Sequence, residues 1–332
     1  SIYSPLELEA YANQIWLFGS SDNSTLLLKS SDGTTWDAVA TPAWETSAQP
    51  LLITSPHSGS RYPQDFLTAS RLDAHAIRQS EDMFVADLFA GVETLGANLL
   101  AARLPRAYLD LNRAPFELEQ ELFEDDLPSQ FNSKSLRARA GLGIVPRLVA
   151  ENTPIYSGKL AFAEAEHRIE KFYTPFHAAL AGKLDELHRQ FGAAILIDAH
   201  SMPSQAARQN DVRPKQPHID IVLGTRHGRA CHGVLTDLIE SFLKASGLSV
   251  ARNQPYAGGY ITEHYGRPDA GVHAIQIEIN HAIYMDERSY QRHAGFDHLS
   301  QTMQKLVAHL AAAPDLAAQL ASDRSQGKSA AE

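Results

Sequence analysis

The fold is decided by the stretch AAILIDAHSMPS (193–204). Its aliphatic residues form an apolar run, which is typical of a strand buried on both faces of a sheet. The run ends in Asp198 and His200, and the ends of such strands are where open α/β sheets bind their ligands. PLLITSPHSGSRYP (50–63) shows the same pattern, an apolar run that is followed by His57. The sequence therefore predicts two strands that each end in a histidine.

On either side of these two strands, apolar runs alternate with longer amphipathic stretches from residue 50 onward. This alternation is typical of an α/β domain with helices on both faces of a sheet. Between Pro115 and Pro154, a segment too long for a simple connection is a candidate lid or substrate loop. Strands are predicted over 50–56, 97–105, 193–199, 218–225 and 273–279, and helices over 80–95, 161–191, 228–246 and 286–312.

The first 48 residues differ from the rest and predict a β-rich extension. Alternating segments at 14–20 and 24–30, joined by Asp- and Asn-containing turns, indicate a β-hairpin or small meander. SSDGTTW (30–36) resembles the Asp-box hairpin of sialidase-like propellers, but it occurs once, whereas propellers repeat their blades. We therefore favour an ordinary turn with a packed Trp36 and keep a non-catalytic glycan-binding protein as an alternative.

The predicted organisation has three parts. The β-rich extension covers residues 1–48, the α/β domain 49–314, and a flexible tail 315–332. The tail is composed of Ala, Ser and charged residues, which favour fraying at a chain end.

Composition excludes several classes of function. A net charge of −10 with scattered basic residues argues against a nucleic-acid partner, which needs clustered Lys and Arg. The apolar runs fall short of the roughly 20 residues that a membrane helix requires. The single cysteine, Cys231, fits a reducing cytoplasm and leaves only His, Asp and Glu to hold a metal. We expect a soluble cytoplasmic protein, a monomer or small homo-oligomer, without a membrane or nucleic-acid partner.

The two strand-end histidines predict a metal site. If their strands are parallel neighbours, His57 and His200 enter one crevice, and two imidazoles with one carboxylate are a usual ligand set of catalytic zinc. For the third ligand the order of preference is Asp82, then Glu81, then Asp198, the last being equally suited to orienting an imidazole. The alternative is that each histidine merely caps its strand.

The strand in HAIQIEINHAIYMDE (273–287) carries a carboxylate among isoleucines. Its alternation puts Ile277 on one face and Glu278 on the other. A carboxylate in so apolar a strand is costly unless it has a partner or a task. Beside a zinc-bound water Glu278 would be the general base, and a hydrogen-bonded structural glutamate is the alternative.

Another strand end, in RLPRAYLDLNRAPFE (103–117), supplies groups for an acidic substrate. The planar fork of arginine matches a carboxylate in two hydrogen bonds, so Arg113 beside Asn112 is a natural clamp. Arg106 would either polarise the scissile carbonyl or pair with Asp110. Structural salt bridges are the alternative for both arginines.

A Gly-Gly turn among aromatic residues, NQPYAGGYITEHYG (253–266), suits a pocket wall that approaches a ligand closely. Tyr260 from this segment and Tyr156 from TPIYSG would hydrogen-bond the substrate. An ordinary loop with buried tyrosines accounts for the same residues.

Five motifs together resemble the N-formylglutamate amidohydrolase family over about residues 50 to 310: SPHSGSRYP, RAYLDLNR, LIDAHSMPS, NQPYAGGYI and IQIEINHAIYMDE. The resemblance implies a three-layer αβα fold like that of zinc carboxypeptidases, with a mixed, mostly parallel sheet and one zinc ion per chain. It also implies His57, an acid at 81–82 and His200 as ligands, Glu278 as base, and Asn112 with Arg113 at the substrate carboxylate.

One motif departs from the family pattern. Members dedicated to histidine degradation carry Asp-Thr-Asp-Trp-His where this chain has SEDMF (80–84), so only Asp82 matches. The expected function is zinc-dependent hydrolysis of a small anionic N-acyl amino acid, with N-formyl-L-glutamate as the leading substrate. Another N-acyl amino acid and a peptidoglycan amide are the alternatives within this chemistry.

Overall fold

The structure is a computed structural model, which describes residues 47–131, 134–206, 219–313 and 315–321, and the backbone of five strands before them. Four of these strands pair in chain order as an antiparallel sheet, the meander that the alternating segments predict. Residues 31–36 of the Asp-box-like turn, with Trp36, lie outside the described residues. The five strands are β1 (Leu8–Tyr11), β2 (Gln14–Ser21), β3 (Ser24–Ser30), β4 (Asp37–Ala38) and β5 (Ala40–Ala43).

The chain divides into two compact units. Unit 1 comprises Ser1–Pro42, Pro56–Asp82 and Ala101–Leu180, and unit 2 comprises Ala43–Ser55, Met83–Leu100 and Ala181–Glu332. The boundary predicted at residue 48 does not coincide with this division, and a separate N-terminal extension remains a prediction.

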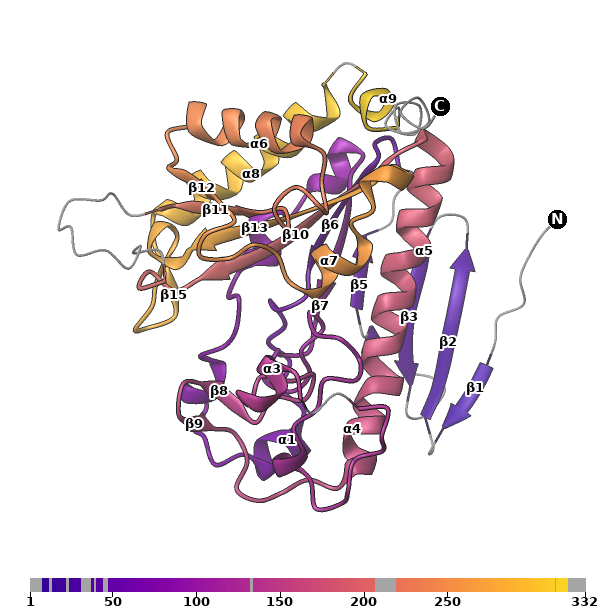
Figure 1. Cartoon of the computed structure of the whole chain (residues 1–332), viewed down its shortest axis with the longest axis vertical. Coiled ribbons are helices and arrows are strands. Elements are labelled where there is room, and N and C mark those ends of the chain that lie inside the picture. The colour runs from indigo at the N-terminus through magenta and orange to yellow at the C-terminus, as the bar shows by residue number, and fades with distance from the viewer. Residues whose placement is uncertain are drawn as a thin grey trace, which may run out of the picture. The chain divides into compact units, whose positions relative to one another are not determined.

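A mixed sheet has most of its strands in unit 2. Its described strands lie in the order β12-β11-β13-β10-β6-β7-β5 (Figure 1). β10 is parallel to both β6 and β13, β11 is parallel to β12, and only the β11–β13 pair among those with a described register runs antiparallel. The predicted mixed, mostly parallel sheet is confirmed. Its remaining strands are β6 (Leu51–Ser55), β7 (Asn98–Ala102), β10 (Ala194–Met202), β11 (Ile221–Gly224), β12 (Val250–Arg252) and β13 (Val272–Asn280).

The two faces of this sheet differ in chemistry. On one face, Ile197 of β10 and Ile277 of β13 join a core cluster with apolar residues of α2 (Val85–Leu88), α6 (Gly233–Ala245) and α8 (Gly295–Ala311). On the other face, His200 and Glu278 are register partners on the same two strands. Alternation along a strand therefore separates a packed apolar face from a face that carries polar groups.

The predicted helices lie where the sequence places them, but two of them are much shorter than predicted. The predicted helix 80–95 is wrong in length, because Phe84 and Gly91 have left-handed backbone angles that end regular helix on either side of α2. The predicted helix 286–312 begins only at Gly295, since the preceding segment contains the paired strands β14 (Met285–Asp286) and β15 (Gln291–Arg292). No helix in the described ranges is long and apolar enough to cross a membrane.

The predicted helix 161–191 is one helical stretch interrupted by a π turn, η4. The α-helices and the π turn are α1 (Gln64–Ala69), α2 (Val85–Leu88), α3 (Leu136–Arg139), α4 (Phe162–Arg168), η4 (Ile169–Tyr173), α5 (Thr174–Phe191), α6 (Gly233–Ala245), α7 (Tyr260–Tyr265), α8 (Gly295–Ala311) and α9 (Leu316–Ala321). Short 3-10 helices are η1 (Ala76–Arg78), η2 (Val92–Leu95), η3 (Gln120–Leu122), η5 (Pro268–Ala270) and η6 (His281–Ile283).

The segment predicted as a lid or substrate loop packs within unit 1. It contains η3, α3 and a small ladder of β8 (Leu148–Ala150) with β9 (Thr153–Pro154). Phe123 and Ile144 from this segment are fully buried. The segment is therefore anchored by buried apolar side chains.

The start of the predicted flexible tail is also packed. Leu316 and Leu320 of α9 belong to the core cluster of unit 2. The prediction of a flexible tail is therefore wrong for 315–321, and residues 322–332 lie outside the described part.

Candidate metal centre

Local structure brings His57 and Asp82 together. His57 lies two residues after the end of β6, and its carbonyl oxygen accepts a hydrogen bond from the backbone N–H of Asp82 at 3.1 Å. The His57 Nδ1 lies 3.3 Å from the Asp82 Oδ2. This backbone hydrogen bond thus holds together two residues that are 25 positions apart in the sequence.

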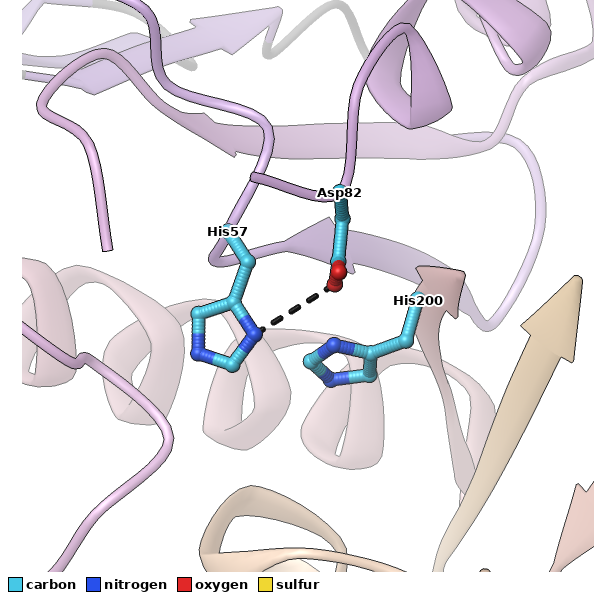
Figure 2. A group of neighbouring side chains, drawn as sticks. All are labelled: His57, Asp82 and His200. Carbon is cyan, nitrogen blue, oxygen red and sulfur yellow. Dashed lines mark ion pairs between the residues drawn. The ribbon is translucent and has the colours of Figure 1, made fainter. Parts of the chain in front are cut away.

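His200 completes a buried group of three possible ligands. His57, Asp82 and His200 each offer one ligand atom, and these atoms all lie within 4.8 Å of one another. Their exposed fractions are 1%, 4% and 2%, respectively. Figure 2 shows the two imidazole rings and the carboxylate facing a common point. This group can hold a metal ion.

Each imidazole has a carboxylate at its other nitrogen. His57 Nε2 lies 2.7 Å from Asp110 Oδ1, and His200 Nε2 lies 2.9 Å from Asp198 Oδ1. If both Nε2 atoms donate to these carboxylates, each neutral ring keeps its Nδ1 lone pair for a metal. Two acceptors, His57 Nδ1 and Asp82 Oδ2, then face each other, and a cation between them satisfies both. The donor set fits zinc.

Asp110 is held as an anion by its surroundings. Burial opposes its ionisation, but the charges of Arg106 and Arg113 and the hydrogen bond with His57 keep the pKa of Asp110 well below its usual range. Arg106 Nε donates to Asp110 Oδ2 at 2.9 Å. Of the two roles predicted for Arg106, the structure shows the ion pair with Asp110.

The two acids at 81–82 have different partners. Glu81 accepts hydrogen bonds from the Tyr62 hydroxyl at 2.6 Å and from the Arg78 guanidinium at 3.0 to 3.2 Å. Asp82, and not Glu81, belongs to the three-residue group. Asp198, the third candidate, contacts His200 Nε2 and accepts from Thr262 Oγ1 at 3.1 Å. This is the position of a carboxylate that orients an imidazole.

Glu278 lies beside His200 on the sheet and is 7% exposed. Its Oε1 accepts a hydrogen bond from Gln276 Nε2 at 2.5 Å, and Gln276 Oε1 accepts from the Gly259 N–H at 2.6 Å. The Gly259 N–H fixes which way the Gln276 amide points, so the amide must donate to Glu278. Gln276 is a partner that was not predicted from the sequence, although strand alternation puts it on the same face as Glu278.

Arg113 is 8% exposed and lies against backbone oxygens. Its Nε donates to the Leu142 carbonyl at 2.9 Å and its Nη1 to the Asn112 carbonyl at 3.0 Å, whereas Asp110 Oδ2 is 3.7 Å from Nε. Burial lowers the pKa of Arg113 to about 10, against the attraction of Asp110. The guanidinium therefore remains cationic at neutral pH. Asn112 is also buried, and its N–H donates to Asp110 Oδ1 at 2.9 Å.

The two predicted substrate tyrosines differ in accessibility. The Tyr156 hydroxyl accepts a hydrogen bond from Arg168 Nη1 at 2.8 Å, and the side chain is buried. Tyr260 begins α7, is half-buried and stacks on His264 with ring centroids 4.9 Å apart. Of the two, Tyr260 is the more accessible.

These features define an α/β protein with a mixed sheet, whose described residues include a buried group of two histidines and an aspartate that could hold a metal ion. The profile of the N-formylglutamate amidohydrolase family matches residues 49–285. The chain belongs to this family, as its five motifs suggest.

Individual relatives agree with this assignment. N-formylglutamate deformylases of Pseudomonas putida and Pseudomonas aeruginosa are both 34% identical over 72% of this chain and over 82% and 84% of their own lengths. The crystal structure of an N-formylglutamate amidohydrolase from Ralstonia eutropha JMP134 is 36% identical, with a TM-score of 0.77 over 82% of this chain and 96% of that one. A gene product of Agrobacterium tumefaciens, 19% identical with a TM-score of 0.55, shares the fold.

Proposed function

We propose that this chain is a zinc-dependent amidohydrolase that converts N-formyl-L-glutamate and water into formate and L-glutamate. The observation that carries the proposal is the buried group of His57, Asp82 and His200 in a member of this family. The names of the Pseudomonas relatives support the choice of substrate. We further propose that the reaction takes place in the cytoplasm, as a step of histidine degradation.

His57, Asp82 and His200 would hold the metal, with one ligand atom each. Zinc bound there supplies a Lewis acid for the amide carbonyl and makes water a stronger acid. Asp110 and Asp198 keep the two imidazoles in the orientation and tautomer that this binding needs.

Glu278 is the proposed general base. It lies on the strand next to His200, on the same sheet face, and is buried. It would take the proton of the attacking water at a carboxylate oxygen and return it to the nitrogen of the leaving amine. The Gln276 amide, which donates to Glu278 Oε1, would keep the second oxygen turned to the substrate.

Asn112 and Arg113 are the proposed binders of a substrate carboxylate. Arg113 keeps its charge at neutral pH, and its hydrogen bonds to backbone carbonyls use Nε and Nη1, so that Nη2 would meet the substrate. Arg106, already paired with Asp110, would add positive charge near the amide carbonyl. Tyr260 would hydrogen-bond the substrate from α7, and Tyr156 is proposed only as a wall of the binding site.

The test combines metal analysis with an assay of formate release. Protein purified without added metal is expected to hold about one zinc ion per chain. The variants His57→Ala and His200→Ala are each expected to lose the zinc ion and roughly 99% or more of the activity, because the metal supplies the chemistry of the reaction. His298→Ala, an exposed histidine of α8, is the matched control and should keep both. Full activity in rigorously metal-free protein would contradict the proposal.

A substrate panel tests the acyl amino acid. N-formyl-L-glutamate, N-acetyl-L-glutamate, N-formyl-L-glutamine and a peptidoglycan amide would be compared by kcat/KM. We expect the highest kcat/KM for N-formyl-L-glutamate. N-formyl-L-glutamine lacks the side-chain carboxylate that Arg113 is proposed to bind, and its kcat/KM is expected to be lower by about 100-fold or more. A higher kcat/KM for another compound of the panel would leave the proposed metal chemistry unchanged and would identify that compound as the better substrate.

A further inference from the structure

One helical stretch holds the loop that carries Asn112 and Arg113. Three of its side chains reach backbone carbonyls of this loop. Arg168 Nη1 donates to the Tyr108 carbonyl at 2.9 Å, and the Tyr173 hydroxyl donates to the Arg113 carbonyl at 2.8 Å. His177 Nε2 lies 2.9 Å from the carbonyl oxygen of Leu111, where it can only donate. The three bonds flank Asn112 on both sides.

The spacing of these three side chains needs the π turn. Tyr173 and His177 are four residues apart, which puts them on one face of an α-helix. Arg168 and Tyr173 are five residues apart, and in a regular α-helix five residues rotate by about 500°, leaving the two side chains about 140° apart. The π turn Ile169–Tyr173 lies between them and takes up the extra residue. It therefore returns Arg168 to the row of Tyr173 and His177.

The packing around this row is close. Arg168 is 2% exposed, and its guanidinium carbon lies 4.0 Å from the centroid of the Tyr108 ring. Tyr173 is 4% exposed and lies against the His177 ring, with centroids 4.1 Å apart. The loop that they hold has no regular secondary structure between Tyr108 and Arg113. Side chains of the helix thus supply hydrogen bonds that a strand or helix would otherwise supply.

We propose that this π turn is a positioning device for Arg113. By fixing the carbonyl oxygens of Leu111 and Arg113, His177 and Tyr173 set the backbone from which the guanidinium extends. Arg113 needs such support, because its hydrogen bonds within the chain go to neutral carbonyls and Asp110 is 3.7 Å from its Nε. The inference rests on the proposed function, in which Arg113 binds a substrate carboxylate. Arg168, Tyr173 and His177 act through that residue and are not catalytic.

The first test removes one hydroxyl. Tyr173→Phe is expected to raise KM for N-formyl-L-glutamate about ten-fold and to change kcat less than about three-fold, since a misplaced clamp weakens binding in the ground and transition states alike. Thr302→Val is the matched control, because it also removes a hydroxyl hydrogen bond to a carbonyl, the 2.9 Å bond from Thr302 Oγ1 to the His298 carbonyl on α8. It is expected to lower thermal stability by a similar amount and to leave KM unchanged.

A double-mutant cycle separates positioning from general destabilisation. With Arg113→Lys as the background, Tyr173→Phe should raise KM no further, because the group that it positions is gone. Multiplicative effects in the double variant would overturn the inference. Wild-type KM in Arg113→Lys would instead overturn the clamp of the proposed function, and with it the inference.

A second variant addresses the turn itself. Inserting one alanine after Glu170, an exposed residue of the π turn, would put Arg168 and Tyr173 six residues apart and should rotate Arg168 out of the row by about 100°. We expect KM to rise at least as much as in Tyr173→Phe, with zinc content unchanged. If Tyr173→Phe fails to fold, His177→Ala takes its place in the cycle. An insertion variant that folds and binds substrate normally would overturn the role of the spacing that the π turn provides.

Discussion

At His57 and His200, the neighbouring carboxylates decide which ring nitrogen is left for a metal. Asp110 occupies the Nε2 side of His57, and Asp198 occupies the Nε2 side of His200. In an imidazole ring, a proton held at one nitrogen leaves a lone pair at the other. The same chemical arrangement therefore occurs twice, once in a loop after β7 and once within β10.

Replacing Asp110 tests this arrangement at a single atom. Asp110→Asn keeps the shape of the side chain but removes the charge that accepts from His57, so zinc affinity is expected to fall about 10- to 100-fold. Competition with a chromogenic chelator would measure it. Asp297→Asn, at an exposed aspartate of α8, is the control and should bind zinc like wild type. Unchanged affinity in Asp110→Asn would show that His57 does not depend on its carboxylate.

Glu287 provides a prediction about pH. Hydrogen bonds from His281 and Ser204 lower the pKa of Glu287 to about 2, although partial burial opposes this. Because the pKa in the folded chain lies below the ordinary value of 4.5, its contribution to stability is complete above pH 4.5 and is lost as the pH falls towards 2.

Glu287→Gln should therefore destabilise the protein at pH 7 and progressively less at lower pH. The side chain is 35% exposed, so solvent screening limits the loss. We expect about 0.5–1 kcal/mol at pH 7. Urea unfolding at pH 7 and about pH 3.5 would measure the gap between variant and wild type, with the exposed Glu166→Gln as control. A gap that widens on acidification would contradict the assignment.

At the scale of elements, α9 shows how a short helix is docked by one hydrogen bond and two leucines. The His232 N–H donates to His273 Nδ1 at 3.2 Å, so the other nitrogen of His273 carries the proton and donates to the Leu320 carbonyl at 3.1 Å. Leu316 and Leu320 lie in the core cluster. The helix is thus attached to β13 through a buried neutral histidine.

Leu320→Ala should cost about 2–4 kcal/mol of the free energy of unfolding, since a fully buried leucine leaves a cavity when it is truncated. Urea denaturation would measure the loss. Leu136→Ala makes the same chemical change at a side chain that is 83% exposed, and should cost almost nothing. Equal effects of the two substitutions would show that α9 is not part of the stable core.

Some helices and strands could be predicted from the sequence, and others could not. β10 and β13 were predictable because their apolar runs are long, and strand alternation alone places Glu278 opposite Ile277. The helix predicted over 80–95 failed at Phe84, whose left-handed backbone no propensity indicates. The π turn was equally hidden, because the apolar pattern of 161–191 is compatible with an uninterrupted helix.

At the scale of the whole molecule, the site is assembled from positions far apart in the chain. The sequence predicted His57 and His200 from their strand ends, and Asp82 was preferred over Glu81 by a partial motif match. Nothing local to Asp82 shows that its N–H bonds the His57 carbonyl, or that Tyr62 and Arg78 occupy Glu81. Contacts of this range depend on the complete fold, and so the sequence alone could not choose among the three acids.

Metal binding should therefore be visible in the stability of the whole chain, independently of catalysis. A ligand that binds only the folded state stabilises it by about 4 kcal/mol when its free concentration is about a thousand times its Kd. Calorimetry of chelated protein, with and without added zinc, is expected to show a rise of several degrees in the unfolding midpoint. Asp82→Asn should lose this rise, whereas Glu81→Gln should keep it, because only Asp82 belongs to the buried group. The reverse result would make Glu81 the third ligand, and a rise in both variants would place that ligand elsewhere, with Asp198→Asn as the next variant to measure.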